Sequence, residues 1–208
     1  MLAQVERLGR LVQQLLDLSR LESGTLALDR RQFEIAPMLE LAVRETRLHA
    51  GTVTLSVEVV PQPFSLDADD ERLHQVVANL VANAVRHSPP AGHVMVRATA
   101  SDGGAVLEVV DEGPGIPDAE ATRVFERFYR ADSARSTRDG GSGLGLAIAQ
   151  WIVELHGGDI RVERNEPHGC RMVVRIPGRV ELHEPPGPNP GSAAPTPSDQ
   201  SLSISERG

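Results

Sequence analysis

The chain has no lysine, so its 21 basic residues are all arginine. This absence excludes a Walker A loop and a Schiff-base mechanism, because both need a lysine amine. A phosphate ligand must instead be held by arginine, by backbone amides or through a metal ion. Cysteine is almost as scarce. Cys170 stands alone, which excludes an internal disulfide and a cysteine-based zinc site and favours a reducing, intracellular location.

The sequence also lacks an excess of positive charge, and it lacks long apolar runs. The 29 Asp and Glu residues outnumber the arginines, and the formal net charge of −8 disfavours binding to nucleic acid. No apolar run approaches the roughly 18 to 20 residues that cross a bilayer, and the N-terminus is too polar for a secretion signal. We therefore expect a cytoplasmic chain that itself contacts neither nucleic acid nor membrane.

Composition divides the chain into three segments. Residues 1–23 carry Leu and Val at spacings of three and four, which predicts an amphipathic helix whose apolar seam needs a partner helix. Residues 24–178 are predicted to form one globular domain. Residues 179–208 are rich in Pro, Ser and Gly and are predicted to be a disordered tail.

Helical and extended patterns alternate within the globular segment. Helices are expected at 36–47, 70–87 and 144–156, and strands at 33–35, 52–60, 93–100, 105–110, 159–163 and 171–176. Tight turns join several strands, so the sheet must be mixed or mostly antiparallel. The pattern predicts an α/β two-layer sandwich with helices on one face rather than a doubly wound parallel sheet.

The expected helix at 70–87 has a polar stripe apart from its apolar face. Asn79, Asn83, Arg86 and His87 recur along this stripe. A solvated surface is the ordinary explanation of such a pattern, but asparagine is a poor helix former. Two amide oxygens one turn apart, followed by a cation, would suit a divalent metal ion beside a phosphate chain.

A carboxylate and two glycines follow the expected strand at 105–110. Asp111 is placed to accept a hydrogen bond from the exocyclic amine of a nucleobase, while Gly113 and Gly115 allow the backbone to approach the ring. An ordinary Asp-Gly turn remains the alternative explanation.

A glycine-rich loop at 140–146 leads into the last expected helix, whose first amides would attract phosphate. The loop follows an irregular stretch and its spacing is G-x-G-x-G, so a flexible lid is favoured over a dinucleotide-binding fingerprint. Before it, the sequence FERFYR at 125–130 combines aromatic rings with arginines. This combination predicts a segment that docks by its rings and presents cations to phosphate, with a surface loop as the alternative.

The ordered set NLVANAVRHS, DEGPGIP, FERFYR and GSGLGLAI resembles the N, G1, F and G2 boxes of bacterial sensor histidine kinases. Their ATP-binding domain belongs to the superfamily of gyrase-type and heat-shock-type ATPases. Upstream, LVQQLLDLSRLESG is similar to the end of the dimerisation and phosphoacceptor hairpin of these kinases. The resemblance runs from Leu2 to about Pro177.

The resemblance implies a role for each matching residue. Asn83 would ligate Mg²⁺ with support from Asn79, and Asn79 and Arg130 would be the catalytic residues. Phe125 and Phe128 would anchor the lid. Arg86 replaces a lysine that is usual in the family, and His87 replaces a tyrosine. The residues implied to bind ATP are Asn79, Asn83, Arg86, His87, Asp111, Gly113, Gly115, Ile116, Tyr129, Arg130, Gly141, Ser142, Gly143, Leu144, Gly145 and Leu146.

The family's phosphoacceptor is missing from the sequence. In the family it is a histidine followed by an acidic residue and Arg-Thr-Pro, and none of the 7 histidines has this context. The resemblance therefore implies the ATP-binding catalytic part of a protein-histidine kinase of a two-component system, incomplete without its phosphoacceptor. It would position Mg-ATP for transfer of the γ-phosphoryl group to a histidine elsewhere and then to a response-regulator aspartate.

Partners follow from the same resemblance. They are a response regulator, a phosphoacceptor hairpin in the full-length kinase or in a partner chain, and a second copy bound through the N-terminal helix. The chain would be the cytoplasmic end of a membrane-anchored sensor. A stand-alone ATP-binding subunit, an anti-sigma-type serine kinase and a non-catalytic scaffold are the alternatives. The serine kinase is disfavoured because it would lack the leucine-rich helix and FERFYR.

Overall fold

The computed structural model describes residues 27–61, 63–130 and 142–183, together with Gly9, Val12, Leu16 and Ser19. These four residues are helical, and the remainder of the helix expected at 1–23 lies outside the described residues. No helix in the described part of the chain is both long enough and apolar enough to cross a bilayer.

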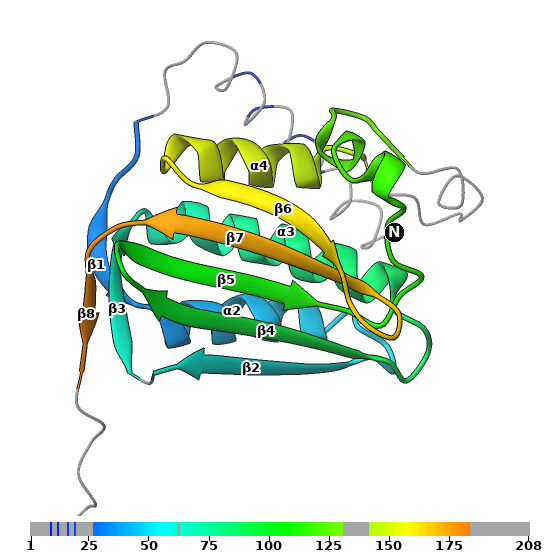
Figure 1. Cartoon of the computed structure of the whole chain (residues 1–208), viewed down its shortest axis with the longest axis horizontal. Helices are drawn as coiled ribbons and strands as arrows, with labels where there is room; N and C mark the ends of the chain where they lie inside the picture. Colours follow the sequence, from blue (N-terminus) through cyan, green and yellow to red (C-terminus); the bar gives the residue numbers. More distant parts are fainter. Residues whose placement is uncertain are drawn as a thin grey trace, which may run out of the picture.

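The described part of the chain forms two sheets (Figure 1). In the larger sheet β2 pairs with β4 in parallel, and the other neighbouring strands are antiparallel. Its strands, in spatial order, are β2 (Thr54–Val60), β4 (His93–Ser101), β5 (Gly104–Val110), β7 (Cys170–Pro177) and β6 (Asp159–Arg164). The smaller antiparallel sheet consists, in spatial order, of β1 (Arg31–Glu34), β3 (Phe64–Ala68) and β8 (Val180–Leu182).

Among the described residues, three helices pack on one face of the larger sheet: α2 (Ile35–Arg47), α3 (Asp70–His87) and α4 (Gly145–Leu155). In Figure 1, α2 and α3 lie behind the sheet. The apolar positions of α3 that the helical period selects, such as Leu73 and Leu80, are buried in the core between these layers. The mixed α/β sandwich with helices on one face is therefore confirmed.

Local signals explain where α3 begins and ends. The side chain of Asp69 accepts a hydrogen bond from the backbone nitrogen of Arg72 at 3.0 Å, which caps the first turn. Pro89 follows the C-cap residue Ser88, and a residue before a proline is driven out of the helical region. The helix expected at 70–87 is found with the same bounds.

The strands β3 and β8 were not predicted. β8 lies at the start of the segment 179–208, so the predicted boundary of the disordered tail is wrong by several residues. The cause is pairing between distant parts of the chain, because Phe64 in β3 faces Leu182 in β8. Phe64 is itself buried, so this pairing covers part of the core. Residues 184–208 lie outside the described residues.

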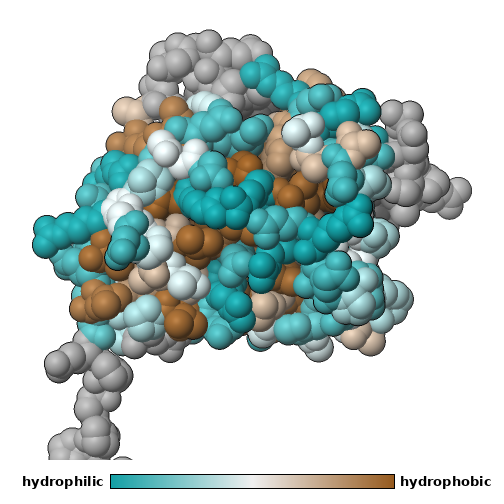
Figure 2. Space-filling view, in the orientation of Figure 1, coloured by the Kyte–Doolittle hydropathy of each residue, from teal (hydrophilic) through white to brown (hydrophobic). Residues whose placement is uncertain are grey.

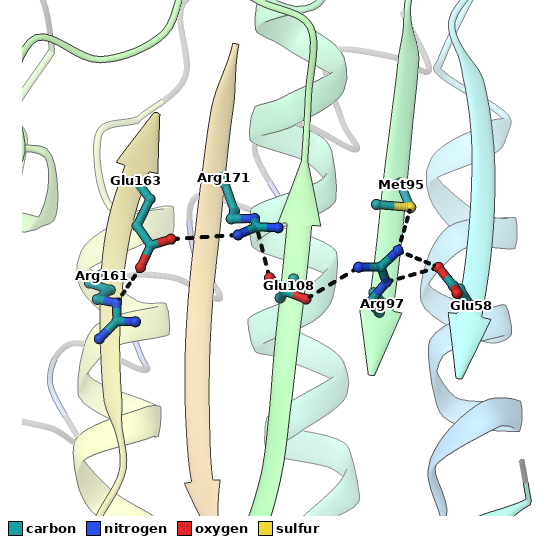
Figure 3. A network of polar contacts seen from close by, with 7 residues as sticks. All are labelled: Glu58, Met95, Arg97, Glu108, Arg161, Glu163 and Arg171. Carbon is teal, nitrogen blue, oxygen red and sulfur yellow. Dashed lines mark hydrogen bonds and ion pairs between the residues drawn. The ribbon is translucent and has the colours of Figure 1, made fainter. Parts of the chain in front are cut away.

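The open face of the larger sheet carries alternating charges, one strand after another (Figure 3). Arg97 lies 2.7 Å from Glu58 and 4.0 Å from Glu108, measured between nitrogen and oxygen. Arg171 lies 3.2 Å from Glu108 and 3.7 Å from Glu163. Figure 2 shows the same face with hydrophilic side chains spread between smaller apolar areas. The charges neutralise one another across the face opposite the three described helices.

Candidate functional site

A cavity of about 400 Å³ lies between α3, the loop that follows β5 and the start of α4. Its volume falls within the range of roughly 300 to 1,000 Å³ that is common for small-molecule sites. The segment after β5 contains two short 3-10 turns, η1 (Asp118–Glu120) and η2 (Arg123–Phe125), and η2 packs against α4 (Figure 1).

Most residues of the predicted ATP-binding set lie around this one cavity, although they come from four separate motifs. Those that line it are Asn79, Asn83, His87, Asp111, Gly115, Ile116, Tyr129, Arg130, Gly143, Gly145 and Leu146. The motifs predicted from the sequence thus converge in space, and both predicted metal ligands are among them.

Four described members of the predicted set do not line the cavity. Arg86 is exposed at the end of α3, and Leu144 is 1% exposed and belongs to the core. Ser142 accepts a hydrogen bond from the backbone nitrogen of Leu144 at 3.2 Å, so it supports the chain before α4. Gly113 is buried behind Asp111. The remaining member, Gly141, lies outside the described residues.

Asp111 is buried at the end of β5 and is held in one orientation. Its Oδ1 accepts hydrogen bonds from the backbone nitrogens of Gly113 at 2.8 Å and Cys170 at 3.1 Å. Within the described residues, Oδ2 has no hydrogen-bond partner. Burial raises the pKa of Asp111, and the two backbone hydrogen bonds partly oppose that shift. The free oxygen can accept a hydrogen bond from a ligand that enters the cavity.

Close packing around Asp111 depends on Gly113. A Cβ atom at this position would lie 2.7 Å from the carbonyl oxygen of His87 and 2.9 Å from Asp111 Oδ1. The glycine therefore allows the loop after β5 to reach the C-terminal end of α3.

The polar stripe of α3 faces the cavity through three side chains. The Nδ2 atom of Asn79 is buried and has no hydrogen-bond partner among the described residues. Asn83 lies one turn further along. Burial is the main cause that lowers the pKa of His87, and the neighbouring charge of Arg86 acts in the same direction. A buried amide without a partner in a cavity indicates a group that a ligand satisfies.

The loop before α4 contacts the FERFYR segment through Gly143. Gly143 has φ +73°, and a Cβ atom there would lie 2.8 Å from the Cα atom of Phe128. The backbone nitrogen of Phe128 donates to the carbonyl oxygen of Gly143 at 2.9 Å. This contact places Tyr129 and Arg130 at the cavity wall.

The two phenylalanines that were expected to anchor the lid differ in burial, and the segment 131–141 lies outside the described residues. Phe125 is 8% exposed and packs into the core, whereas Phe128 is 62% exposed. Phe128 also has φ +62°, and its backbone nitrogen bonds to Gly143. Spacing in the sequence does not reveal this reversal of the backbone.

Five lining residues were not predicted: Pro114, Pro117, Glu120, Val124 and Cys170. The prolines adjoin a predicted motif, but no local pattern distinguishes Glu120 or Val124. Cys170 reaches the site from β7 because its backbone nitrogen bonds to Asp111. Burial raises the pKa of its thiol to about 12, so the thiol is a neutral part of the wall.

A metal ion held by protein carboxylates alone does not fit this site. The described residues contain no group of three or more His, Cys, Asp or Glu that could hold one. Asn79 and Asn83 instead offer amide oxygens, and Mg²⁺ readily combines one or two protein ligands with phosphate oxygens and water. The unsatisfied Nδ2 atom of Asn79 is a donor, so it would bond to a phosphate oxygen beside the metal ion and not to the metal ion itself. The residues present therefore fit Mg²⁺ that arrives with a triphosphate.

Known proteins share both the sequence and the fold. Residues 68–180 match the family described as histidine kinase-, DNA gyrase B-, and HSP90-like ATPase. The chain is 39% identical over 175 residues to the probable sensor histidine kinase TcrY of Mycobacterium tuberculosis, which covers 84% of this chain and 36% of TcrY. It is also 39% identical over 204 residues to the histidine-protein kinase/phosphatase MprB of Mycobacterium sp. strain KMS, covering 96% and 38% of the two chains. It thus spans less than two fifths of these relatives.

Solved structures extend the likeness. The mycobacterial sensor histidine kinase MprB superposes with a TM-score of 0.63 at 35% identity, covering 72% of this chain and 98% of that one. Full-length ShkA in complex with AMPPNP superposes with a TM-score of 0.73 at 28% identity, covering 84% and 36%. The chain belongs to the histidine kinase-, DNA gyrase B-, and HSP90-like ATPase family and carries the ATP-binding domain of its sensor histidine kinases.

Proposed function

We propose that the chain binds Mg-ATP in the described cavity and positions the γ-phosphoryl group for transfer to a histidine that lies outside its own sequence. The observation that carries this proposal is the pairing of two unsatisfied groups in one cavity. Asp111 offers a free carboxylate oxygen, and Asn79 offers a buried amide without a partner. An amino-purine with a metal-bearing triphosphate satisfies both.

The adenine would lie at the Asp111 end of the cavity. The free Oδ2 would accept from the exocyclic amine, and Ile116 and Cys170 would supply apolar walls for the ring. The hydrogen bonds from Gly113 and Cys170 keep the carboxylate oriented before a ligand arrives, which lowers the cost of binding.

The triphosphate would lie between α3 and the start of α4. Asn83 and Asn79 would hold Mg²⁺, which neutralises charge on the phosphates when bound. Arg130 would approach the terminal phosphate, and the first-turn amides of α4, beginning at Gly145, would favour negative charge. The contribution of the chain is positioning and electrostatic stabilisation, while the nucleophile comes from another segment.

Partners and location follow as proposals from family membership. The histidine would be on a helical hairpin of a longer kinase or of a separate subunit, and a response regulator would receive the phosphoryl group. The segment 1–23 would join a second copy. In a full-length sensor the described domain would lie at the cytoplasmic end of a membrane anchor.

Titration of a fluorescent ATP analogue into the 208-residue chain, with and without Mg²⁺, tests the proposal. We expect saturable binding that tightens with Mg²⁺ and is reversed by unlabelled ATP. Absence of saturable binding would favour a scaffold without nucleotide chemistry. Incubation with a phosphoacceptor hairpin and labelled ATP then separates the two kinase classes, because phosphohistidine is lost in acid and phosphoserine is retained.

A further inference from the structure

The described lining of the cavity carries more acidic than basic side chains, although a triphosphate is itself an anion. Among the described lining residues there are two carboxylates, Asp111 and Glu120, and one guanidinium, Arg130. A carboxylate that faces phosphate would repel it, so each carboxylate needs a hydrogen-bond donor from another part of the ligand. Asp111 is assigned to the base amine under the proposed function. Glu120 has no assignment.

Glu120 lies on the chain between the residues of the base end and those of the phosphate end. It is the last residue of η1, and its backbone nitrogen donates to the carbonyl oxygen of Pro117 at 2.8 Å. Pro117 and Ile116 belong to the loop beside Asp111, whereas Tyr129 and Arg130 follow later. Glu120 thus lines the cavity from the segment that joins these two groups of residues.

The side chain of Glu120 is partly buried, and within the described residues it has no hydrogen bond or ion pair. Two arginines that could neutralise Glu120 are paired with other carboxylates. Arg164 lies 3.1 Å from Asp118, and Arg123 lies 4.0 Å from Glu126. The carboxylate is therefore available to a ligand in the cavity.

We propose that Glu120 recognises the ribose, accepting hydrogen bonds from its 2′ and 3′ hydroxyl groups. The assignment rests on the proposed binding of ATP. Apart from the base amine that is assigned to Asp111, the ribose hydroxyl groups are the hydrogen-bond donors that ATP offers, and Glu120 is the other carboxylate among the described lining residues. A vicinal diol offers two donors to the two oxygens of one carboxylate, and an ionised acceptor strengthens each hydrogen bond.

The test compares ATP with 2′-deoxy-ATP and 3′-deoxy-ATP by titration calorimetry on the 208-residue chain in the presence of Mg²⁺. The wild type is expected to bind ATP about five- to tenfold more tightly than either deoxynucleotide. Glu120→Ala should remove this preference, so that the three nucleotides bind with similar affinities, because ATP loses two hydrogen bonds and each deoxynucleotide loses the one that it makes in the wild type. Glu120→Gln keeps one acceptor oxygen and should give an intermediate ratio.

Glu126→Gln is the matched control, because Glu126 lies in the same segment but does not line the cavity. It should keep the wild-type ratio of affinities. An unchanged ratio in Glu120→Ala, with ATP still bound, would overturn the ribose assignment alone. An equal loss for all three nucleotides that disappears without Mg²⁺ would place Glu120 at the metal and would also overturn it. Absence of ATP binding by the wild type would overturn both this assignment and the proposed function.

Discussion

His156 connects the two helices that flank the cavity. Its Nε2 atom accepts a hydrogen bond from the backbone nitrogen of Asp69 at 3.2 Å, and its Nδ1 atom donates to the carbonyl oxygen of Ile152 at 2.8 Å. Both bonds form only when the ring is neutral with its proton on Nδ1. The side chain of Asp69 accepts in turn from the backbone nitrogen of Asp29 at 3.0 Å. Hydrogen bonds of one buried histidine thus join the end of α4 to the start of α3. The side chain of Asp69 extends this connection to the segment before β1.

This arrangement predicts that the domain loses stability as the pH falls below about 6.5. Burial is the main cause that lowers the pKa of His156, and also that of His87, below 6.5. Between 6.5 and the lower pKa of the folded state, the unfolded chain therefore binds more protons than the folded protein. The free energy of unfolding falls over that interval and stops falling below it. Urea unfolding at about pH 7.5 and about pH 5.5 measures the difference.

Replacement of His156 measures how much of this pH dependence of the free energy of unfolding is due to His156. His156→Gln should lower the free energy of unfolding by about 2 to 3 kcal/mol at neutral pH, because buried partners lose their hydrogen bonds. It should also reduce the pH dependence, and His87 should contribute to what remains. His168→Gln is the control, since His168 is exposed and removing it breaks no buried side-chain bond. Equal pH dependence in His156→Gln and the wild type would contradict the prediction.

Removal of the amides on α3 should affect the ligand more than the fold. Asn79→Ala and Asn83→Ala are each expected to weaken Mg-ATP binding at least tenfold, because an oxygen that would hold Mg²⁺ is lost. Asn79→Ala should leave the stability of the nucleotide-free protein unchanged or raise it, since it removes a buried donor without a partner. Calorimetry with and without Mg²⁺, together with thermal unfolding, provides both measurements. Normal Mg-ATP binding in both variants would contradict the metal assignment.

Replacement of Asp111 should have opposite effects on stability and on binding. Because burial raises its pKa, the folded protein holds a proton on Asp111 to a higher pH than the unfolded chain does. The resulting stabilisation is lost as the pH rises from 3.8 through the pKa of the folded state, so the ionised carboxylate opposes folding above that pKa. Asp111→Asn keeps the acceptor for Gly113 and Cys170 but removes the charge. The nucleotide-free variant should unfold at a higher temperature than the wild type at neutral pH.

The same variant should bind ATP about 10- to 100-fold more weakly, because an amide donor would face the adenine amine. A ribose triphosphate without the base provides the control ligand and should lose much less affinity. Equal losses for the two ligands would argue against adenine recognition at Asp111.

The features that the sequence predicts well depend on neighbours along the chain. The bounds of α3 follow from Asp69 and Pro89, which act within one turn. The strand β8 depends on pairing with β3, more than one hundred residues earlier, and its own short sequence carries no matching signal. The residues that line the cavity likewise fall into those with a local sequence signal and those without one. Asp111 and the glycines belong to recognisable motifs, whereas Glu120 reaches the wall only through the way that the segment after β5 folds back.

The contact between Gly143 and Phe128 predicts that a single methyl group disturbs the ATP site. In Gly143→Ala, the new Cβ atom would lie 2.8 Å from the Cα atom of Phe128, displacing the backbone that carries Tyr129 and Arg130. We expect at least a tenfold loss of ATP affinity and a destabilisation of about 1 to 2 kcal/mol. Gly103→Ala has the same sign of φ but meets nothing within 4 Å, so it should cost about 1 kcal/mol and leave ATP affinity unchanged. Equal ATP affinities in the two variants would show that displacement of this backbone does not control the site.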